Sequence, residues 1–377
     1  MRKLRLGKTL CMLGITAMAM AFSGVTGLGN KLGLSITAEA ETFTINATNQ
    51  LSDGTSAGEY SYSISKDAKE ITIDKYFGTA TTIDLPKVLE QLKEEDKISS
   101  DAKIVAIGYD CFAEDKDNLT SIVLPRTLKT IGHDAFSSQS TTGTVLTSVT
   151  WENTGEKIQL TSIGEYAFFR CKSLTGFEFG DNLTTIGRGA FKESGLTDIK
   201  IPASCTSIEG NDKGSDTTDG AFYGCEVRTL TFEGGNISLG LAAFSNCEKL
   251  TSVTFKGETR DIAIGKDAFY NCTGLTDVVF NGKAGNVTIG EEAFYDCSKL
   301  EKVTFNNEKD KITIGTNAFY NCSKLANVAF AEGKSIITIG ENAFYGCSGL
   351  ELMDFGIGVS AEITNGRIPN NSKLIFY

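Results

Sequence analysis

Histidine is nearly absent from this 377-residue chain, which contains only His133. Nucleophilic catalysis by a Ser-His or Cys-His arrangement would therefore depend on one side chain. His133 stands in the segment IGHDAF, at a position where similar segments carry Tyr, Lys or Glu. We expect a solvated surface histidine, no catalytic residue and no enzyme activity. Two acids could still converge into a glycosidase-type pair, although the sequence marks none.

Basic residues are also too few to favour a polyanionic partner. The chain has 36 Lys and Arg against 47 Asp and Glu, a net charge of −11. Without the first 40 residues, 31 basic and 46 acidic residues remain. Such a surface repels phosphate backbones and anionic lipid. We therefore expect no nucleic-acid partner, and no membrane insertion after removal of the N-terminal segment.

The N-terminus has the pattern of an export signal. Residues 2–8 are cationic, and an apolar run follows from Leu10 to Val25. Ala38-Glu39-Ala40 offers a small-x-small cleavage site, and a cut after Ala21 also fits the pattern. A retained membrane anchor is disfavoured because Gly, Ser and Thr interrupt the run. We assign residues 1–40 as a signal peptide and expect a secreted or cell-surface protein.

One motif recurs along most of the chain. Its anchors are ten phenylalanines: Phe112, Phe136, Phe168, Phe191, Phe222, Phe244, Phe269, Phe294, Phe319 and Phe344. The last four intervals are 25 residues each, and the earlier ones are 24, 32, 23, 31 and 22. Ile or Leu lies five residues before the anchor, Gly four before and Ala one before. Cys follows at three residues after it, Leu at six, Val at nine and Phe at eleven.

Two periodicities alternate inside each unit. Segments such as KLEKVTF alternate apolar and polar residues, which predicts a half-buried strand. IGEEAFYDC places Ala293, Phe294 and Cys297 one helical turn apart, which predicts a short helix or 3₁₀ turn. A single unit cannot bury its apolar face, but stacked units form a continuous core. We predict a repeat solenoid of about ten units of 22–32 residues, each with a short strand plus a turn or short helix.

The pattern C-x-x-L-x-x-V-x-F followed by I-G-x-x-A-F resembles the BspA-like leucine-rich repeats of bacterial surface proteins. The resemblance covers about Ile107 to Phe355. Insertions at 137–144 and 209–220 interrupt it. Three units carry another residue at the Cys position, namely Asp115, Gln139 and Ser194. The resemblance implies a leucine-rich repeat fold and an adhesin-type binding role.

Residues 41–103 lack the repeat and are expected to cap the N-terminal end of the array. YSYSISKDAKEITIDKYFG alternates on both sides of a polar turn, which predicts a β-hairpin. DLPKVLEQLKEEDK predicts a short helix with Asp84 near its N-cap and Val88, Leu89 and Leu92 facing inward. Because a solenoid needs its open ends covered, we place the solenoid at 104–355. A C-terminal cap with a last strand and turn is expected at 356–377.

The cysteines and the acidic insertion are the features closest to metal chemistry. Seven cysteines share one repeat position: Cys171, Cys225, Cys247, Cys272, Cys297, Cys322 and Cys347. They lack the C-x-x-C clustering of zinc sites, and side chains packed side by side in a core favour free thiols over disulfides. Cys111 and Cys205 are off register and are the candidates for reactive exceptions. The insertion at 209–220 has Asp212, Asp216 and Asp219 but lacks EF-hand spacing. We predict an acidic loop, no metal site and no cofactor.

Two surfaces are candidates for ligand binding. The first is the outer face of the predicted strands, eight and ten residues after the anchors: Ser252, Thr254, Asp277, Val279, Lys302, Thr304, Asn327 and Ala329. The alternative is an aromatic stripe on the convex side: Tyr223, Tyr270, Tyr295, Tyr320 and Tyr345. These rings have a structural role instead if they cover the turn below them and are half buried.

An extended sheet face with little chemistry of its own suits the recognition of large ligands. With the family resemblance, it predicts a secreted or cell-surface binding protein for host extracellular proteins or other cells. A glycan-binding module or enzyme is one alternative, and a structural component of the cell envelope is the other. A monomer is expected. The ligand, the face that binds and the means of surface retention stay open, since no sortase-type motif lies near Tyr377.

Overall fold

The structure, a computed structural model, describes residues 41–46, 59–95, 98–113, 118–211, 218–257, 261–281, 285–306, 311–333, 335–356, 359–363 and 373–375. Contacts divide the chain into a unit of Met1–Glu41 and a unit of Thr42–Tyr377. The second unit holds the architecture described below. The expected signal peptide and the centre of the acidic insertion, residues 212–217, lie outside the described residues.

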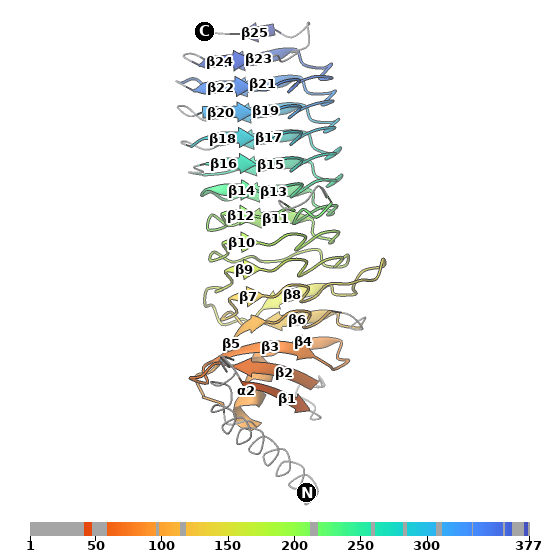
Figure 1. Ribbon diagram of the computed structural model, residues 1–377, viewed down its shortest axis with the longest axis vertical. Coiled ribbons are helices and arrows are strands. Elements are labelled where there is room, and N and C mark those ends of the chain that lie inside the picture. The colour runs from red at the N-terminus through yellow and green to blue at the C-terminus, as the bar shows by residue number, and fades with distance from the viewer. Residues whose placement is uncertain are drawn as a thin grey trace, which may run out of the picture. The chain divides into compact units, whose positions relative to one another are not determined.

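The chain forms a solenoid whose successive turns carry short parallel strands (Figure 1). A 14-stranded sheet contains β1 (Glu41–Asn46), β2 (Glu59–Ile64), β3 (Glu70–Tyr76), β5 (Lys103–Ile107), β7 (Thr130–Ile131), β9 (Ser162–Ile163), β10 (Thr185–Ile186), β12 (Ser207–Ile208), β14 (Ile237–Leu239), β16 (Ile262–Ile264), β18 (Val287–Ile289), β20 (Lys311–Ile314), β22 (Ile336–Ile339) and β24 (Ser360–Ile363). The predicted solenoid is confirmed, and it has a second strand in each regular unit that the sequence analysis missed.

The strands foreseen from the apolar–polar alternation form two other sheets. An eight-stranded sheet contains β11 (Asp198–Ile201), β13 (Thr229–Phe232), β15 (Ser252–Phe255), β17 (Asp277–Phe280), β19 (Lys302–Phe305), β21 (Asn327–Phe330), β23 (Leu352–Phe355) and β25 (Lys373–Ile375). A three-stranded sheet contains β4 (Thr82–Asp84), β6 (Ser121–Leu124) and β8 (Ser148–Trp151). The last strand expected near the C-terminus corresponds to β25, and β24 precedes it.

In-register stacking builds the core. In the regular units each strand pairs with its equivalent in the next turn, so that Val278 lies opposite Val253 on one side and Val303 on the other. The ten anchor rings form one continuous ladder with neighbouring centroids 4.8–5.4 Å apart. A second ladder of six rings runs from Phe232 to Phe355 at 4.5–5.2 Å. Each turn therefore covers the apolar face of the one before it.

The segment around each anchor is a pair of tight turns, and the short helix allowed by the sequence analysis is absent from the described units. A left-handed residue lies two positions before and two after most anchors; Glu292 has φ 57° and Asp296 has φ 57° around Phe294. Such a residue interrupts a right-handed helix, and Asn and Asp tolerate it better than most others. The turns hydrogen bond across units instead, as the Phe294 N–H does to the Ala318 carbonyl at 2.7 Å.

The N-terminal elements agree with the predicted hairpin and helix. Strands β2 and β3 pair antiparallel, and β3 continues in parallel to β5. Helix α2 (Leu85–Glu95) begins where the Lys87 N–H donates to Asp84 Oδ1 at 3.2 Å. Val88, Leu89 and Leu92 are buried, as expected. The first repeat thus stacks on a sheet that the hairpin has already started.

Among the described repeat units, the strand stack is interrupted once. The three-stranded sheet ends at β8, the eight-stranded sheet begins at β11, and the segment between them, around residues 175–179, forms no strand. In this unit Gly176 and Phe177 replace the polar residue and the Val of regular units. Glycine disfavours a strand, and the larger ring packs against Phe168 and Phe191 at centroid distances of 5.3 and 5.6 Å. The sequence thus prevents pairing at one turn.

Candidate functional site

The structure brings the eight strand-face candidates together in two rows across β15, β17, β19 and β21. One row consists of Ser252, Asp277, Lys302 and Asn327, which lie opposite one another in successive strands. The other row consists of Thr254, Val279, Thr304 and Ala329. Asp277 and Lys302 are exposed, and the other six are half-buried. Neighbours within a row are about 4.8 Å apart because they occupy adjacent strands. The eight residues form one contiguous surface.

The two rows differ in chemistry. The first carries both charge signs and hydrogen-bonding groups, and Asp277 already accepts a hydrogen bond of 2.6 Å from the Thr276 hydroxyl. The second is small and largely apolar. Between them the valines at 253, 278, 303 and 328 are 0% exposed and are committed to the core. The sheet therefore holds the outer side chains in fixed positions, with a polar line beside an apolar one.

Four of the five candidate tyrosines form a stack. Tyr270, Tyr295, Tyr320 and Tyr345 follow one another at centroid distances of 5.2, 4.7 and 4.9 Å. Tyr223 is separated from them because Ser245 occupies the intervening position. Each inner ring has neighbours on both faces, so solvent meets only ring edges. Tyr270 and Tyr345 end the stack with a ring neighbour on one face, and Tyr345 is 42% exposed.

The tyrosine stack lies beside acidic groups. Burial raises the pKa of Tyr270 and of Tyr295, and the Asp296 carboxylate raises both further. The Tyr270 and Tyr295 phenols therefore stay protonated at neutral pH and can donate hydrogen bonds at the stripe. Both faces of the Tyr295 and Tyr320 rings are covered, so face-to-face binding of a sugar ring is possible only at the ends of the stack, where Tyr270 is half-buried and Tyr345 is exposed.

The cysteine ladder consists of buried free thiols, as predicted from the sequence. Each thiol donates to the carbonyl of the preceding anchor, for example from Cys297 Sγ to Phe269 O at 3.3 Å. Burial raises the pKa of Cys171 and of Cys225 to about 12. The expectation that Cys111 and Cys205 are reactive exceptions is wrong. Both are buried, and burial raises the pKa of Cys205 to about 12.

His133 is a partly exposed residue flanked by acids. Its side chain is 40% exposed, with Nδ1 2.6 Å from Asp134 Oδ2 and Nε2 3.8 Å from Glu165 Oε2. The Tyr109 ring lies 5.2 Å from the imidazole. The imidazole thus lies between two carboxylates, and its Nδ1 makes no hydrogen bond of normal geometry to a described residue. In the described part of the chain, no group of three or more His, Cys, Asp or Glu side chains is placed to hold a metal ion.

Two surface hollows were missed by sequence reasoning. The larger, about 540 Å³, is lined by Lys172, Thr175, Glu193, Ser194, Gly195, Thr197, Gly224 and Glu226. It lies where two neighbouring units have a shorter turn, since Leu196 follows Phe191 by five residues instead of six, and Val227 follows Phe222 by five. That change in spacing is the sequence signal for the hollow.

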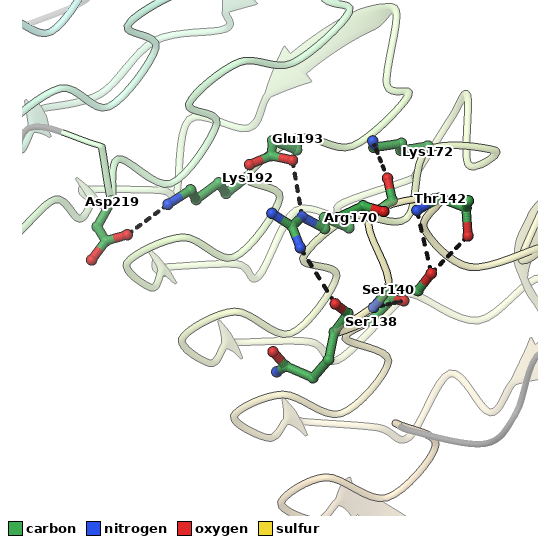
Figure 2. Close-up of polar contacts among 10 residues, drawn as sticks. Ser138, Ser140, Thr142, Arg170, Lys172, Lys192, Glu193 and Asp219 are labelled. Atoms are coloured by element: carbon green, nitrogen blue, oxygen red, sulfur yellow. Dashed lines mark hydrogen bonds and ion pairs between the residues drawn. The ribbon is translucent and has the colours of Figure 1, made fainter.

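Contacts around Lys172 and Glu193, which line this hollow, also involve the first insertion (Figure 2). Arg170 donates to Glu193 Oε2 at 3.0 Å and to the Gln139 carbonyl at 3.5 Å. The Lys172 ammonium donates to the Thr141 carbonyl at 2.7 Å. Two cations of one unit thus hold the 137–144 insertion of the preceding unit.

Asp219, at the edge of the acidic insertion, is held by cations as well. Lys192 Nζ lies 2.8 Å from Asp219 Oδ1, a contact also drawn in Figure 2. Arg188 approaches the same carboxylate at 3.9 Å. Of the three aspartates of the insertion, Asp212 and Asp216 lie outside the described residues. The described end of the loop is therefore anchored by ion pairs.

The smaller hollow, about 390 Å³, lies at the break in the sheet. It is lined by Phe177, Phe179 and Pro202 and by exposed charged residues that are called its rim below: Glu178, Asp181, Asp198, Lys200 and Glu233. The two hollows adjoin, because Thr197 lines one and Asp198 the other. The sequence signal is the Gly176-Phe177 pair at positions that elsewhere carry a polar residue and Val.

The repeat spacing, the two Phe ladders and the stacked turns agree with a comparison against protein families. A family model described as a BspA type leucine rich repeat region of six copies matches residues 42–159, 143–212 and 215–351. The chain belongs to the BspA-type leucine-rich repeat family. In this family member the matched region includes the hairpin and helix as well as the regular units. A search of curated proteins returned no match.

Solved structures with a similar chain trace include other leucine-rich repeat proteins. One from Bacteroides ovatus is 19% identical, covers 84% of this chain and 98% of its own, and has a TM-score of 0.45. A leucine rich cell surface protein from Faecalibacterium prausnitzii is 20% identical, with coverages of 80% and 93% and a TM-score of 0.37. The pneumococcal vaccine antigen PcpA is 16% identical, with coverages of 88% and 94% and a TM-score of 0.39. The family assignment rests on the sequence match.

Proposed function

We propose that this chain is a secreted or cell-surface binding protein of adhesin type, which recognises host extracellular proteins or other cells through the outer face of β15, β17, β19 and β21. The observation that carries the proposal is the pair of registered rows on that face. A polar row with both charge signs beside an apolar row offers specificity and contact area together. The proposal assigns the chain no chemical reaction.

Membership of the BspA-type family supports a role outside the cell, and so does the export pattern of residues 1–40. No helix in the described ranges is long and apolar enough to cross a membrane. One of the similar structures is named a cell surface protein and another a vaccine antigen. We infer an extracellular location on the strength of the family and the export pattern.

The strand face is favoured over the tyrosine stripe for a geometric reason. The face presents eight side chains of differing chemistry on four adjacent strands, whereas the stripe presents ring edges of one kind. Aromatic recognition of a glycan needs open ring faces; the Tyr295 and Tyr320 rings are covered on both faces, whereas Tyr345 ends the stack and is 42% exposed. Glycan binding at Tyr345 is the second candidate function, and it rests on that exposed ring.

The test measures binding of the chain from Glu41 onward to a panel of extracellular matrix proteins and glycans. A double variant, Lys302→Glu with Thr254→Trp, reverses one charge and fills the apolar row. We expect at least tenfold weaker binding of the partner identified, with the free energy of unfolding changed by no more than about 0.5 kcal/mol. Lys324→Glu is the matched control, since Lys324 is exposed and lies in the turn region outside the face.

Three outcomes would contradict the proposed face or function. Unchanged binding in the double variant, with loss in Tyr345→Ala, assigns the glycan or protein site to the stripe. Equal losses in the double variant and in Lys324→Glu indicate a diffuse charge effect. No binding to any panel member favours a structural role in the cell envelope.

A further inference from the structure

The break between β8 and β11 leaves strand edges without a partner strand. In Figure 1 the turns between these strands carry arrows only for β9 and β10, which belong to the other sheet. Among the described residues, β8 pairs with β6 alone and β11 with β13 alone. Every other interior strand of the described repeat sheets has a neighbour on each side. The break is therefore a local departure from complete backbone pairing.

The free edge of β11 presents specific backbone groups. In a parallel strand, alternate residues direct their N–H and C=O groups to opposite sides. The carbonyls of Thr197 and Ile201 accept hydrogen bonds from Arg228 and Glu233 in the next unit. The intervening residues Asp198 and Lys200 therefore direct their backbone groups toward the break. Both have exposed side chains as well.

The segment across the break does not fill this edge. The Thr197 N–H donates to the Thr175 carbonyl at 3.2 Å, and the next backbone bond between these units is from Thr206 to Thr184. Between these bonds, residues 176–181 make no backbone–backbone hydrogen bond to any described residue. The Trp151 indole donates to the Glu178 carbonyl at 2.9 Å and holds the segment from the other side. The smaller hollow lies between 177–181 and 198–202.

The charges around the hollow are predominantly negative. Glu178, Asp181, Asp198 and Glu233 surround one cation, Lys200. Glu233 also contacts Lys256 at 3.4 Å, and Asp198 accepts a hydrogen bond from the Thr229 hydroxyl at 2.5 Å. The Phe177 ring contributes an apolar, half-buried wall. A cationic side chain can approach both the carboxylates and an aromatic ring here.

We propose that the break is a docking site for an extended, Lys- or Arg-containing segment of a partner protein, which adds a strand to the free edge of β11. Backbone hydrogen bonds to Asp198 and Lys200 would supply affinity, as in other cases of strand addition. The acidic rim and Phe177 select basic side chains. This site is separate from the β15–β21 face, and the proposal does not rest on the proposed function.

Trp151 provides a local reporter, because it is the only tryptophan in the chain and its indole contacts the segment at the break. The probe is a capped eight-residue peptide that alternates lysine and threonine. We expect it to shift the Trp151 emission and to slow amide hydrogen exchange at Asp198 and Lys200. A peptide that alternates glutamate and threonine should bind at least tenfold more weakly.

Backbone pairing is tested on both partners. Lys200→Pro removes the N–H that faces the break, at an edge position where proline is tolerated. Lys200→Thr is the matched control, because it removes the same charge and keeps the N–H. We expect at least tenfold weaker binding to the proline variant than to the threonine variant. The lysine–threonine peptide with all backbone nitrogens methylated should also bind at least tenfold more weakly than the unmethylated peptide. This measurement uses the unchanged protein and so does not depend on the folding of a variant.

The acidic rim is tested by Glu178→Gln with Asp198→Asn. Glu341→Gln with Glu301→Gln is the control, since both residues are exposed acids away from the break. The first pair should weaken peptide binding at least fivefold and the second less than twofold. Binding that is insensitive to Lys200→Pro and to N-methylation, or that leaves Trp151 emission and the amides at 198–200 unchanged, overturns the proposal.

Discussion

The array has a regular set of units, anchored from Phe244 to Phe344, and an irregular set, anchored from Phe136 to Phe222. Both sets stack their anchor rings in the same way, but they differ in the spacing of the anchors along the sequence. The first set repeats every 25 residues, whereas intervals in the second are 32, 23 and 31. In the regular set each strand continues the sheets, while the irregular set contains the break, both hollows and both insertions. Both sets nevertheless keep the anchor ladder near 5 Å.

The anchor side and the strand side of each turn differ in how much irregularity they tolerate. The anchor side is fixed by ring stacking and by hydrogen bonds between turns, so a change there would interrupt the core. The strand side accepts a missing residue or a bulkier side chain, because the unpaired backbone groups lie at the surface and meet water. Irregular units therefore create recognition features without opening the core.

The largest expected effect is the loss of unfolding free energy on removal of a regular anchor ring, compared with removal of the Phe177 ring at the break. Phe294→Ala removes a fully buried ring stacked on Phe269 and Phe319, and we expect a loss of about 3–5 kcal/mol in the free energy of unfolding. Phe177→Ala should cost less, about 1–3 kcal/mol, because that ring is half-buried. Chemical denaturation measures both.

Hydrogen exchange sharpens the same comparison. Because repeat units couple mainly to their neighbours, increased exchange in Phe294→Ala should centre on the units at Phe269 and Phe319. A uniform increase over the whole chain, or a larger loss from Phe177→Ala than from Phe294→Ala, would contradict this account of the array.

The next effect concerns a buried acid in the regular region. Asp267 is only 5% exposed, and its Oδ1 has no hydrogen-bond partner among the described residues. Burial raises the pKa of this carboxyl to about 6. Lys266 acts against this increase, and Glu292 and Glu291 add to it. The unfolded chain releases this proton near pH 4, so Asp267 lowers folded-state stability as pH rises from about 4 to 6. The full penalty is present at pH 7.

Asp267→Asn should therefore stabilise the protein at pH 7 by about 1–3 kcal/mol and leave it nearly unchanged at pH 4. Asparagine also suits the left-handed φ of 56° at this position, as at Asn317 and Asn342 of later units. Thermal unfolding across pH 4–8 gives the difference between variant and parent. An equal gain at both pH values would show that backbone preference, not ionisation, is the cause.

Thiol labelling compares local opening in the two regions. Both Cys171, in the unit that contains the break, and Cys297, in the regular region, are fully buried. Labelling requires opening of the array. We expect Cys171 to react about tenfold faster than Cys297, equivalent to about 1.4 kcal/mol less free energy of opening, because its unit lacks a paired strand. Mass spectrometry of the labelled peptides measures the ratio, and equal rates would show that the break does not weaken its unit.

The smallest effect is a partial repair of the break. A Cβ at Gly176 would meet no atom within 4 Å, and its φ is not left-handed. Gly176→Thr should stabilise the protein by about 0.5–1 kcal/mol through reduced unfolded-state entropy and higher strand propensity. Gly195→Ala is the contrasting change, because its Cβ would lie 2.2 Å from the Lys172 carbonyl oxygen. Destabilisation by Gly176→Thr would show that glycine is required at the break.

The repeat period, the buried positions and the family were available from sequence because stacking imposes the same apolar pattern on each unit. Phe294, Cys297 and Val303 could be assigned to the core for that reason, as could the hairpin and the helix at 85–95. The second strand of each unit was missed because segments such as VTI are three residues long and lie beside a glycine that reads as a turn. The turn in place of a short helix was missed because left-handed residues have only a weak Asn and Asp signal.

That the chain stacks follows from its sequence, since each unit has an apolar face that only another unit can cover. The sequence also shows which strand residues point outward, because side chains alternate with a period of two. Only the folded chain shows that the faces of Tyr295 and Tyr320 are covered, that Cys111 and Cys205 are buried, and that the sheet is broken beside Phe177. These properties depend on contacts between residues some 20–35 positions apart, where one missing residue opens a surface hollow and one larger ring interrupts the pairing of strands.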